Sequence, residues 1–323
     1  MEPLLPIALF ILSMAALVKA ADIFIGSSEQ IGRHLGIPSF VLGVTVVSFG
    51  TSLPEISSAI YASISGNSQV VFGSAVGSNL TNILLILGLA AIVAKNLSVK
   101  YDLLHVDLPI FIGATFLVVL SAQDGSISKY ESLLMIFGLV VYILYAIHVR
   151  SSSTSAHQRL EIEAKHRSRK EQLGAMTFVK IALGIVLLVL ASKYVVDSIV
   201  DISTMLGVPS DMIAITAFSL GTSLPELMII LTSLKKGLRE VVVGNIMGSS
   251  IFNLFGAIGI PALLGDVTVS HETYYLIAPI LVATGLLYFF ITQERQITQW
   301  EGLLLLIFYL FFLGQVITSA VAI

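Results

Sequence analysis

An eight-residue phrase occurs twice in this chain of 323 residues, as SFGTSLPE at 48–55 and as SLGTSLPE at 219–226. Both copies lie inside apolar stretches. A second pair has the same offset of 171 residues, because GSAVGSNLTN at 73–82 matches GNIMGSSIFN at 244–253. The chain therefore contains two copies of one unit, and each copy carries polar groups in an apolar setting. Such internal duplication is typical of many secondary transporters.

The composition is that of a membrane protein. Hydrophobic residues make up 56% of the chain, charged residues 11%, and the mean hydropathy is +0.96. A soluble domain carries roughly twice this charged fraction. The chain has no cysteine, which excludes disulfides, thiolate metal sites and cysteine nucleophiles. The first apolar segment follows a lone acid, Glu2, without a basic leader, so we expect a retained helix and not a cleaved signal.

Ten apolar runs are long enough to cross a bilayer, which takes about 20 residues per helix. Five precede the most polar segment of the chain and five follow it. The sequence thus predicts an all-α integral membrane protein with ten transmembrane helices. The predicted spans are 4–24, 37–64, 70–94, 104–122, 131–149, 175–197, 208–234, 241–264, 273–292 and 300–321.

The polar segment divides the chain into two predicted repeats. Residues 1–149 form the first repeat, with its motifs within 43–88, and residues 175–323 form the second, with its motifs within 214–259. Residues 150–174 form a linker. Placing this linker in the cytoplasm puts 14 of the 17 Lys and Arg residues on that side, as the positive-inside rule requires. We therefore expect a multi-pass protein of the cell membrane with both termini extracellular. Because five crossings are an odd number, the two repeats must have inverted topology.

The repeated phrase predicts a cluster of oxygen ligands. In each copy a threonine, a serine and a glutamate occupy positions i, i+1 and i+4, which share roughly one face of a helix. They are Thr51, Ser52 and Glu55 in the first copy and Thr222, Ser223 and Glu226 in the second. Pro54 and Pro225 each lack an N–H and crowd the carbonyl four residues back, so we expect each helix to break or kink here. A broken helix within the membrane frees carbonyls, which must be buried or line a wet cavity.

The second motif adds a hydroxyl and an amide to each half. Ser78 and Asn82 form an i, i+4 pair, as do Ser249 and Asn253. The glycines at 73 and 77, like those at 244 and 248, form the small-xxx-small pattern that lets membrane helices approach closely. An all-oxygen site without His or Cys suits sodium, calcium or magnesium better than zinc or copper.

Each feature also has a structural interpretation. Most Ser and Thr side chains in membrane helices bond their own backbone, and a GxxxG pattern is more often packing than function. A buried Glu is different, because its insertion costs at least about 2.5–3.5 kcal/mol. Asp22 and Lys193 occupy equivalent positions, for which we expect an ion pair or an interfacial placement. Asp107 and Glu131 lie near predicted helix ends, where a charge costs little. We interpret the linker histidines as part of a solvated cytoplasmic face; they are His148, His157 and His166.

These motifs resemble the paired alpha-repeats of the sodium/calcium exchanger family, within the cation/calcium exchanger superfamily, and its short prokaryotic type in particular. The resemblance covers both repeats and the linker, which has no room for the large regulatory insertion of animal exchangers. It implies antiport of sodium against calcium by alternating access, in which the first and sixth helices slide past the rest. The resemblance implies no cofactor beyond the transported ions Ca²⁺ and Na⁺. The expected environment is the lipid bilayer, and we expect that the protein can work as a monomer.

The resemblance also assigns ligand roles. It makes Glu55 and Glu226 the central acidic ligands, with hydroxyl or backbone oxygens from the neighbouring Thr and Ser residues. Ser78 and Ser249 would serve flanking sodium sites, Asn82 and Asn253 the middle, and the carbonyls of Ser48 and Ser219 would add weaker ligands. Many family members have an aspartate at the position of Asn253. The chain thus has two formal negative charges in the site, which leaves the ion stoichiometry and any potassium dependence open.

Three other functions remain as alternatives. A proton/calcium exchanger of the same superfamily is the nearest, since a buried Glu can titrate near neutrality, although that branch typically carries a GNA-type motif here. A cation channel could use the same oxygens, but inverted repeats with broken helices favour a carrier. An intramembrane hydrolase is disfavoured because the chain has no HExxH, GxSxG or paired-aspartate motif. Nucleic-acid binding is not suggested, because the basic residues are topology signals.

Overall fold

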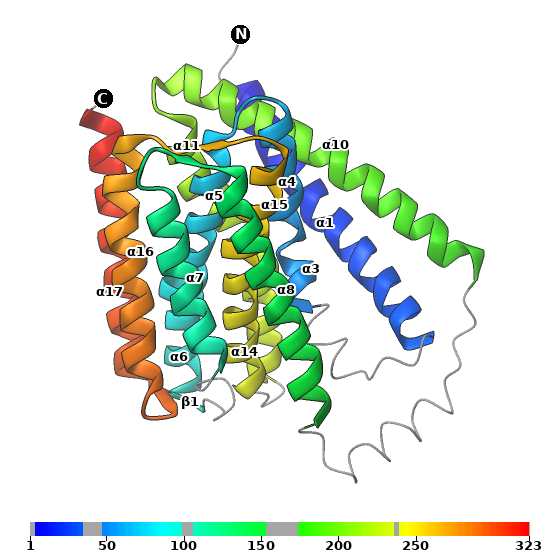
Figure 1. The fold of residues 1–323 in the computed structure, drawn as a ribbon, viewed down its shortest axis with the longest axis vertical. Helices are drawn as coiled ribbons and strands as arrows, with labels where there is room; N and C mark the ends of the chain where they lie inside the picture. The colour runs from blue at the N-terminus through cyan, green and yellow to red at the C-terminus, as the bar shows by residue number, and fades with distance from the viewer. Residues whose placement is uncertain (1–3, 35–46, 99–105, 153–173, 236–238, 323) are drawn as a thin grey trace.

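The computed structural model describes residues 4–34, 47–98, 106–152, 174–235 and 239–322. Nearly all of them are helical, as the sequence predicts. Most helices stand side by side in a bundle, and two long ones, α1 (Leu4–His34) and α10 (Ala175–Leu206), run next to each other obliquely along its side (Figure 1). The linker residues 153–173, with His157 and His166, lie outside the described part of the chain.

Eight helical segments in the described residues are long and apolar enough to cross a membrane. They are Leu5–Phe24, Gln69–Ala94, Lys129–Ala146, Ala175–Leu206, Ser210–Lys235, Val242–Leu264, His271–Thr292 and Gln299–Ala320. The other two predicted spans are described only in part, as α3 (Val47–Thr51) with α4 (Leu53–Ile64) and as α7 (Leu108–Ser121). The helical membrane class is confirmed, and the count of ten crossings stays a prediction.

Several spans are composite, because short π-helical stretches interrupt them. The first is α5 (Gln69–Leu80), η2 (Thr81–Leu87) and α6 (Gly88–Ala94). The second is α11 (Ser210–Ile213), η4 (Ala214–Phe218), α12 (Ser219–Thr222) and α13 (Leu224–Lys235). The third is α14 (Arg239–Ile251), η5 (Phe252–Ala257) and α15 (Ile258–Leu264). The remaining helices are α8 (Lys129–Ser152), α16 (His271–Thr292) and α17 (Gln299–Ala322). Short π-helical turns are often found at functional sites.

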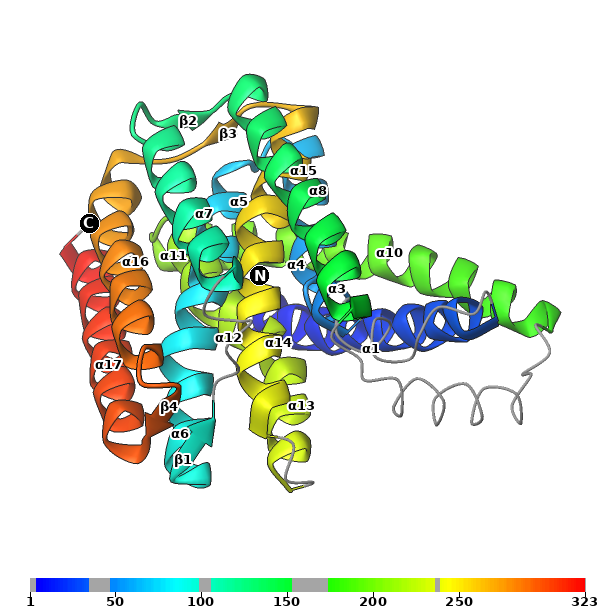
Figure 2. The same cartoon turned by 60° about the horizontal axis from the view of Figure 1, so that its bottom comes forward.

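Two short antiparallel ladders join the two halves of the chain. Strand β1 (Asn96–Ser98) pairs with β4 (Gln296–Thr298), and β2 (Ser126–Ile127) pairs with β3 (Val267–Thr268). Leu97 lies opposite Ile297 in one ladder, and Ile127 lies opposite Val267 in the other. All four side chains are fully buried. The two ladders lie at opposite ends of the bundle (Figure 2). Each ladder therefore pairs a strand of one half with a strand of the other.

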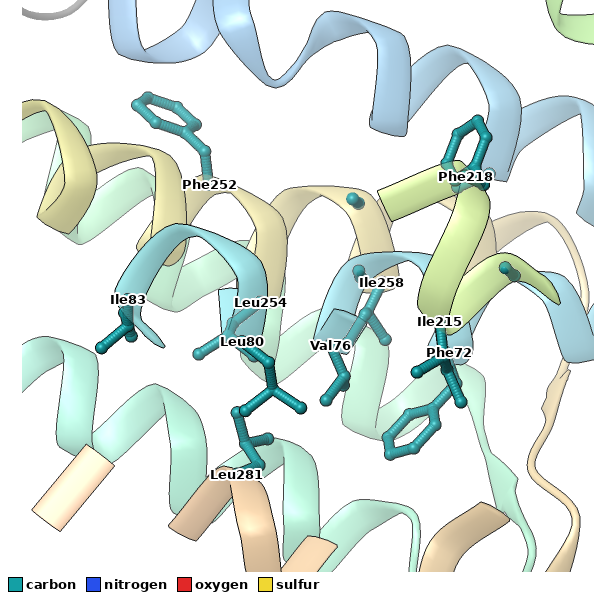
Figure 3. Close-up of a cluster of buried hydrophobic side chains, with 14 of the residues drawn as sticks. Phe72, Val76, Leu80, Ile83, Ile215, Phe218, Phe252, Leu254, Ile258 and Leu281 are labelled. Atoms are coloured by element: carbon teal, nitrogen blue, oxygen red, sulfur yellow. The ribbon is translucent and has the colours of Figure 1, made fainter. Parts of the chain in front are cut away.

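The centre of the bundle is formed by the two spans that carry the second motif. Buried residues make up 78% of an 18-residue stretch of the Gln69–Ala94 span and 89% of one in the Val242–Leu264 span, against 22% of one in the Gln299–Ala320 span. Figure 3 shows their apolar side chains in one cluster with residues of η4 and α16, including Phe72, Leu254 and Leu281. The outer helices instead expose large apolar side chains, such as Leu12, Phe137 and Leu310. This arrangement suits a bundle surrounded by lipid.

Candidate cation-binding site

Both helices that carry the repeated phrase are interrupted at the same residue of the phrase. α3 ends at Thr51 and α4 begins at Leu53, while α12 ends at Thr222 and α13 begins at Leu224. The intervening Ser52 has ψ near −2° and Ser223 near −1°. In both copies proline follows two residues later and cannot donate to the carbonyl four residues back. The predicted break is therefore confirmed, and it is confined to a single serine in each half.

All predicted site residues are buried. Glu55 and Glu226 are fully buried, and none of the others is more than 3% exposed. The others are Ser48, Thr51, Ser52, Ser78, Asn82, Ser219, Thr222, Ser223, Ser249 and Asn253. Lone side chains of this kind at membrane depth would be costly, so their common burial indicates one shared polar interior.

Hydrogen bonds join the motifs both within a half and across the two halves. The Ser78 hydroxyl donates to Glu55 Oε1 at 2.7 Å and lies 3.2 Å from the Ser223 hydroxyl. In the other half, the Ser249 hydroxyl lies 3.1 Å from the Thr51 hydroxyl, and the Ser249 carbonyl accepts from Ser52 at 3.5 Å. The repeated phrase of each half thus contacts the second motif of the opposite half. The site is built from both copies, and neither copy could form it alone.

The two glutamates form the charged centre of this cluster. Their carboxylates interact electrostatically with each other. The threonine of the opposite half lies near each carboxylate, Thr222 near Glu55 and Thr51 near Glu226. Like charges brought together in an apolar interior repel each other unless a cation lies between them or one of them is protonated.

Several polar side-chain atoms of this cluster have no hydrogen-bond partner among the described residues. They are Glu55 Oε2, both carboxylate oxygens of Glu226 and both side-chain amide atoms of Asn82 and of Asn253. Buried polar groups in folded proteins are nearly always paired, so each unpaired group requires an explanation. Bound cations would satisfy the oxygens. Among the described residues, no three His, Cys, Asp or Glu side chains are grouped so that they could hold a metal ion. The donor set of this site therefore consists of two carboxylates and neutral oxygens.

Ser48 and Ser219 occupy equivalent packing positions against glycines. A Cβ at Gly248 would lie 2.6 Å from the Ser48 hydroxyl, and a Cβ at Gly77 would overlap the Ser219 hydroxyl. Their carbonyls accept hydrogen bonds from the threonines of the phrase, at 3.2 Å from Thr51 and 3.3 Å from Thr222. These glycines allow the close helix approach that the small-xxx-small pattern predicts.

The sequence of this chain matches a known protein family over both halves. The family model described as sodium/calcium exchanger protein matches residues 5–148 and 176–318, which are the two halves without the linker. The chain belongs to the sodium/calcium exchanger family. The family resemblance drawn from the sequence is thereby confirmed, and with it the expectation of a transport protein and not an enzyme.

Individual proteins match this exchanger-family chain over most of its length. The sodium/calcium exchanger MaX1 of Methanosarcina acetivorans is 30% identical, covering 94% of this chain and 96% of MaX1. The inner membrane protein YrbG of Escherichia coli is 32% identical, covering 81% of this chain and 80% of YrbG. A structure of the sodium-calcium exchanger NCX_Mj soaked with 10 mM Na⁺ and no Ca²⁺ is 26% identical with a TM-score of 0.66, covering 97% of this chain and 99% of that one.

Some polar positions of this exchanger-family chain differ from the sequence interpretation. Asp107 lies just before α7, as expected, but it is only 2% exposed, so the expectation that its charge costs little was wrong. Asp22 pairs with Lys19 at 3.8 Å. Asn79 was not assigned a role, yet its amide donates to the Ser250 carbonyl at 3.2 Å across the centre of the bundle. The signal for it was present, because Asn79 and Ser250 occupy equivalent places in the duplicated motif.

Proposed function

We propose that this protein is a sodium/calcium antiporter that works by alternating access, with Glu55 and Glu226 as the central ligands. One observation carries the proposal: two fully buried carboxylates, one from each half, have unpaired oxygens in a cluster of hydroxyls and amides. The names of relatives support the choice of ions, since MaX1 is a sodium/calcium exchanger and NCX_Mj was soaked with Na⁺, Ca²⁺ and Sr²⁺.

The proposed ligand set is the one that the family resemblance implies, and the burial of its residues supports it. Glu55 and Glu226 bind the divalent ion, and the amides of Asn82 and Asn253 complete the middle of the site. Thr51, Ser52, Thr222 and Ser223 contribute hydroxyl or backbone oxygens, Ser78 and Ser249 serve flanking sodium sites, and the carbonyls of Ser48 and Ser219 add weaker contacts. One Ca²⁺ or two Na⁺ balances the two carboxylates. A third Na⁺ would leave one positive charge for carbonyl dipoles to offset.

Ten crossings in two inverted repeats are part of the proposal, with the first repeat at 1–149, the linker at 150–174 and the second repeat at 175–323. The two strand ladders between the halves support this inverted arrangement. A strand that follows the central helix in one half pairs with a strand that precedes the last helix of the other, and the reverse pairing recurs at the opposite end of the bundle. Two halves related in this way run in opposite directions across the membrane. In such a fold, the two halves exchange their conformations when the protein changes from its inward-open to its outward-open state.

The transport cycle follows from charge. A site holding Ca²⁺ or Na⁺ is roughly neutral and can be enclosed, while an empty site retains two bare carboxylates whose enclosure in a low-dielectric interior is unfavourable. The protein therefore exchanges Ca²⁺ and Na⁺ across the membrane and does not let either ion leak. The oblique pair α1 and α10 is the proposed moving element, because it lies along the side of the bundle and not within it (Figure 1). We place the protein in the cell membrane as a monomer, with both termini extracellular and the linker cytoplasmic.

The test is ⁴⁵Ca²⁺ uptake into proteoliposomes loaded with Na⁺. Glu55→Gln and Glu226→Gln each remove one charge while keeping the side-chain shape, so we expect uptake to fall to background. The exposed Glu294→Gln is the matched control and should transport normally. Full uptake by either buried variant would overturn the site. Uptake driven by a proton gradient and not by internal Na⁺ would support the proton/calcium alternative instead.

A further inference from the structure

We propose that Asp211 is a positioning residue for ion binding: it anchors the Ser210 end of the span that carries Thr222, Ser223 and Glu226 to α16. This proposal rests on the proposed function of the central site. Asp211 lies in α11, at the first turn of that span, and its side chain is only 3% exposed. It belongs to neither repeated motif.

Three donors surround the Asp211 carboxylate. The Ser270 hydroxyl donates to Oδ2 at 3.0 Å, and the Thr273 hydroxyl donates to the same oxygen. The backbone N–H of Met212 donates to Oδ1 at 2.9 Å. Ser270 is the N-cap of α16 and also accepts from the Thr273 N–H at 3.2 Å. One carboxylate therefore fixes the start of α11 to the start of α16. Hydrogen bonds to a charged group are among the stronger ones in proteins.

The same end of the span is pressed against α5. A Cβ added at Gly73 would lie 2.8 Å from the Asp211 carbonyl oxygen and 3.1 Å from Ile215. Gln69 of α5 donates from its side-chain amide to the Ser210 hydroxyl at 3.3 Å. α11 is thus held between α16 and α5, and α5 also carries Ser78, which bonds Glu55.

A continuous helical stretch leads from this anchor to the site. α11 continues without a loop into η4 and α12. The Ser219 hydroxyl donates to the carbonyls of Ala214, at 2.7 Å, and of Ser74, at 3.1 Å. The Thr222 hydroxyl donates to the Phe218 carbonyl at 3.2 Å. Displacement of α11 would therefore move Thr222 and the adjacent Ser223, whose hydroxyl lies 3.2 Å from that of Ser78.

The carboxylate is better suited to anchoring than to holding an ion. Both of its oxygens already accept hydrogen bonds, in contrast to Glu55 Oε2 and to the Glu226 oxygens, which have no partner among the described residues. The sequence of the first half does not repeat this carboxylate. At the offset of 171 residues the counterpart of Asp211 is Phe40, whose ring has no acceptor atom. Two halves that are otherwise equivalent therefore differ at this position.

The first test separates positioning from folding. Asp211→Asn and Thr273→Val each remove part of the anchor, and we expect the KM for Ca²⁺ in sodium-driven uptake to rise about 10-fold in correctly folded, monodisperse protein. Asp211→Glu keeps the charge and should recover part of the affinity. The neighbouring Glu272 on α16 is exposed, so Glu272→Gln is the matched control and should leave the KM unchanged. A purely structural role would lower the yield of folded protein and leave the KM of the folded fraction at the wild-type value. That result would overturn the proposal.

A second test does not depend on transport. The chain has no cysteine, so Ala214→Cys introduces a single thiol at a fully buried position of η4. We expect Asp211→Asn to increase its rate of maleimide labelling about 10-fold, and Glu272→Gln to have no effect. Equal rates in all three backgrounds would refute the anchor, even if the protein exchanges no ions. Absence of sodium-driven uptake in wild-type protein, with the labelling difference intact, would instead refute the proposed function.

Discussion

At the scale of single residues, the central site is defined by unsatisfied oxygens. Glu55 has one hydrogen-bonded oxygen, from Ser78, while both oxygens of Glu226 lack a partner among the described residues. A buried carboxylate without compensation is costly, so a folded chain retains two of them only where something else compensates them. In the proposed cycle, bound cations supply that compensation in every occupied state. The same chemistry makes the hydroxyls around the glutamates important, because they help set the geometry of the carboxylates.

Ser78 is the residue through which this geometry can be tested. Ser78→Ala removes the hydrogen bond to Glu55 and the contact with Ser223, and we expect sodium-dependent ⁴⁵Ca²⁺ uptake to fall about 10-fold, which corresponds to roughly 1.4 kcal/mol. Ser74→Ala, one turn earlier on α5, is the matched control, since its hydroxyl donates only to the Val71 carbonyl within its own helix. Equal losses in both variants would mean that the Ser78 hydroxyl has no special role.

At the scale of helices, the sequence predicted the most where the pattern was local. The proline-associated breaks lie inside the repeated phrase, as expected, and the eight described spans agree with eight of the ten apolar runs. The π-helical stretches η2, η4 and η5 could not be predicted, because an inserted residue in a helix depends on tertiary packing. The role of Asp211 was missed for a similar reason. Its partners Ser270 and Thr273 are 59 and 62 residues away in the sequence, with no motif to connect them.

The close contact of α5 with η4 gives a prediction about stability. A Cβ at Gly77 would lie 2.7 Å from the Ile215 Cα and would also overlap the Ile215 carbonyl oxygen, and backbone atoms cannot rotate away. We expect Gly77→Ala to destabilise the protein by about 1–3 kcal/mol and to lower its apparent Tm in detergent. Gly113→Ala is the control, because nothing lies within 4 Å of a Cβ at that position of α7. An unchanged Tm for Gly77→Ala would show that the two helices separate without cost.

At the scale of the whole molecule, equivalent contacts connect each half to the other. The contacts of Thr51 with Ser249 and of Ser78 with Ser223, and both ladders, run from one half to the other. Even the helix starts next to the ladders are alike, since Glu131 accepts from the Ser128 N–H at 2.8 Å and Glu301 accepts from the Thr298 N–H at 2.6 Å. The sequence predicted the duplication, but the pairing of β1 with β4 and of β2 with β3 required the structure. Mutual exchange of equivalent contacts is the property of a two-fold relation, as in a symmetric dimer.

This relation predicts which loops share a side of the membrane. Asp124 and Asp266 flank one ladder and are exposed, while Asn96 and Glu294 lie at the other ladder and are also exposed. In this cysteine-free chain, single cysteines at these positions can be labelled with a membrane-impermeant maleimide in right-side-out vesicles. With the linker in the cytoplasm, we expect Asp124→Cys and Asp266→Cys to react from outside, and Asn96→Cys and Glu294→Cys to react only after the membrane is permeabilised. Labelling of the opposite pair would reverse the orientation and keep the inverted repeats. Labelling of one residue from each ladder would contradict the two-fold relation, and the alternating-access cycle built on it, because the ladders could not then lie on opposite faces of the membrane.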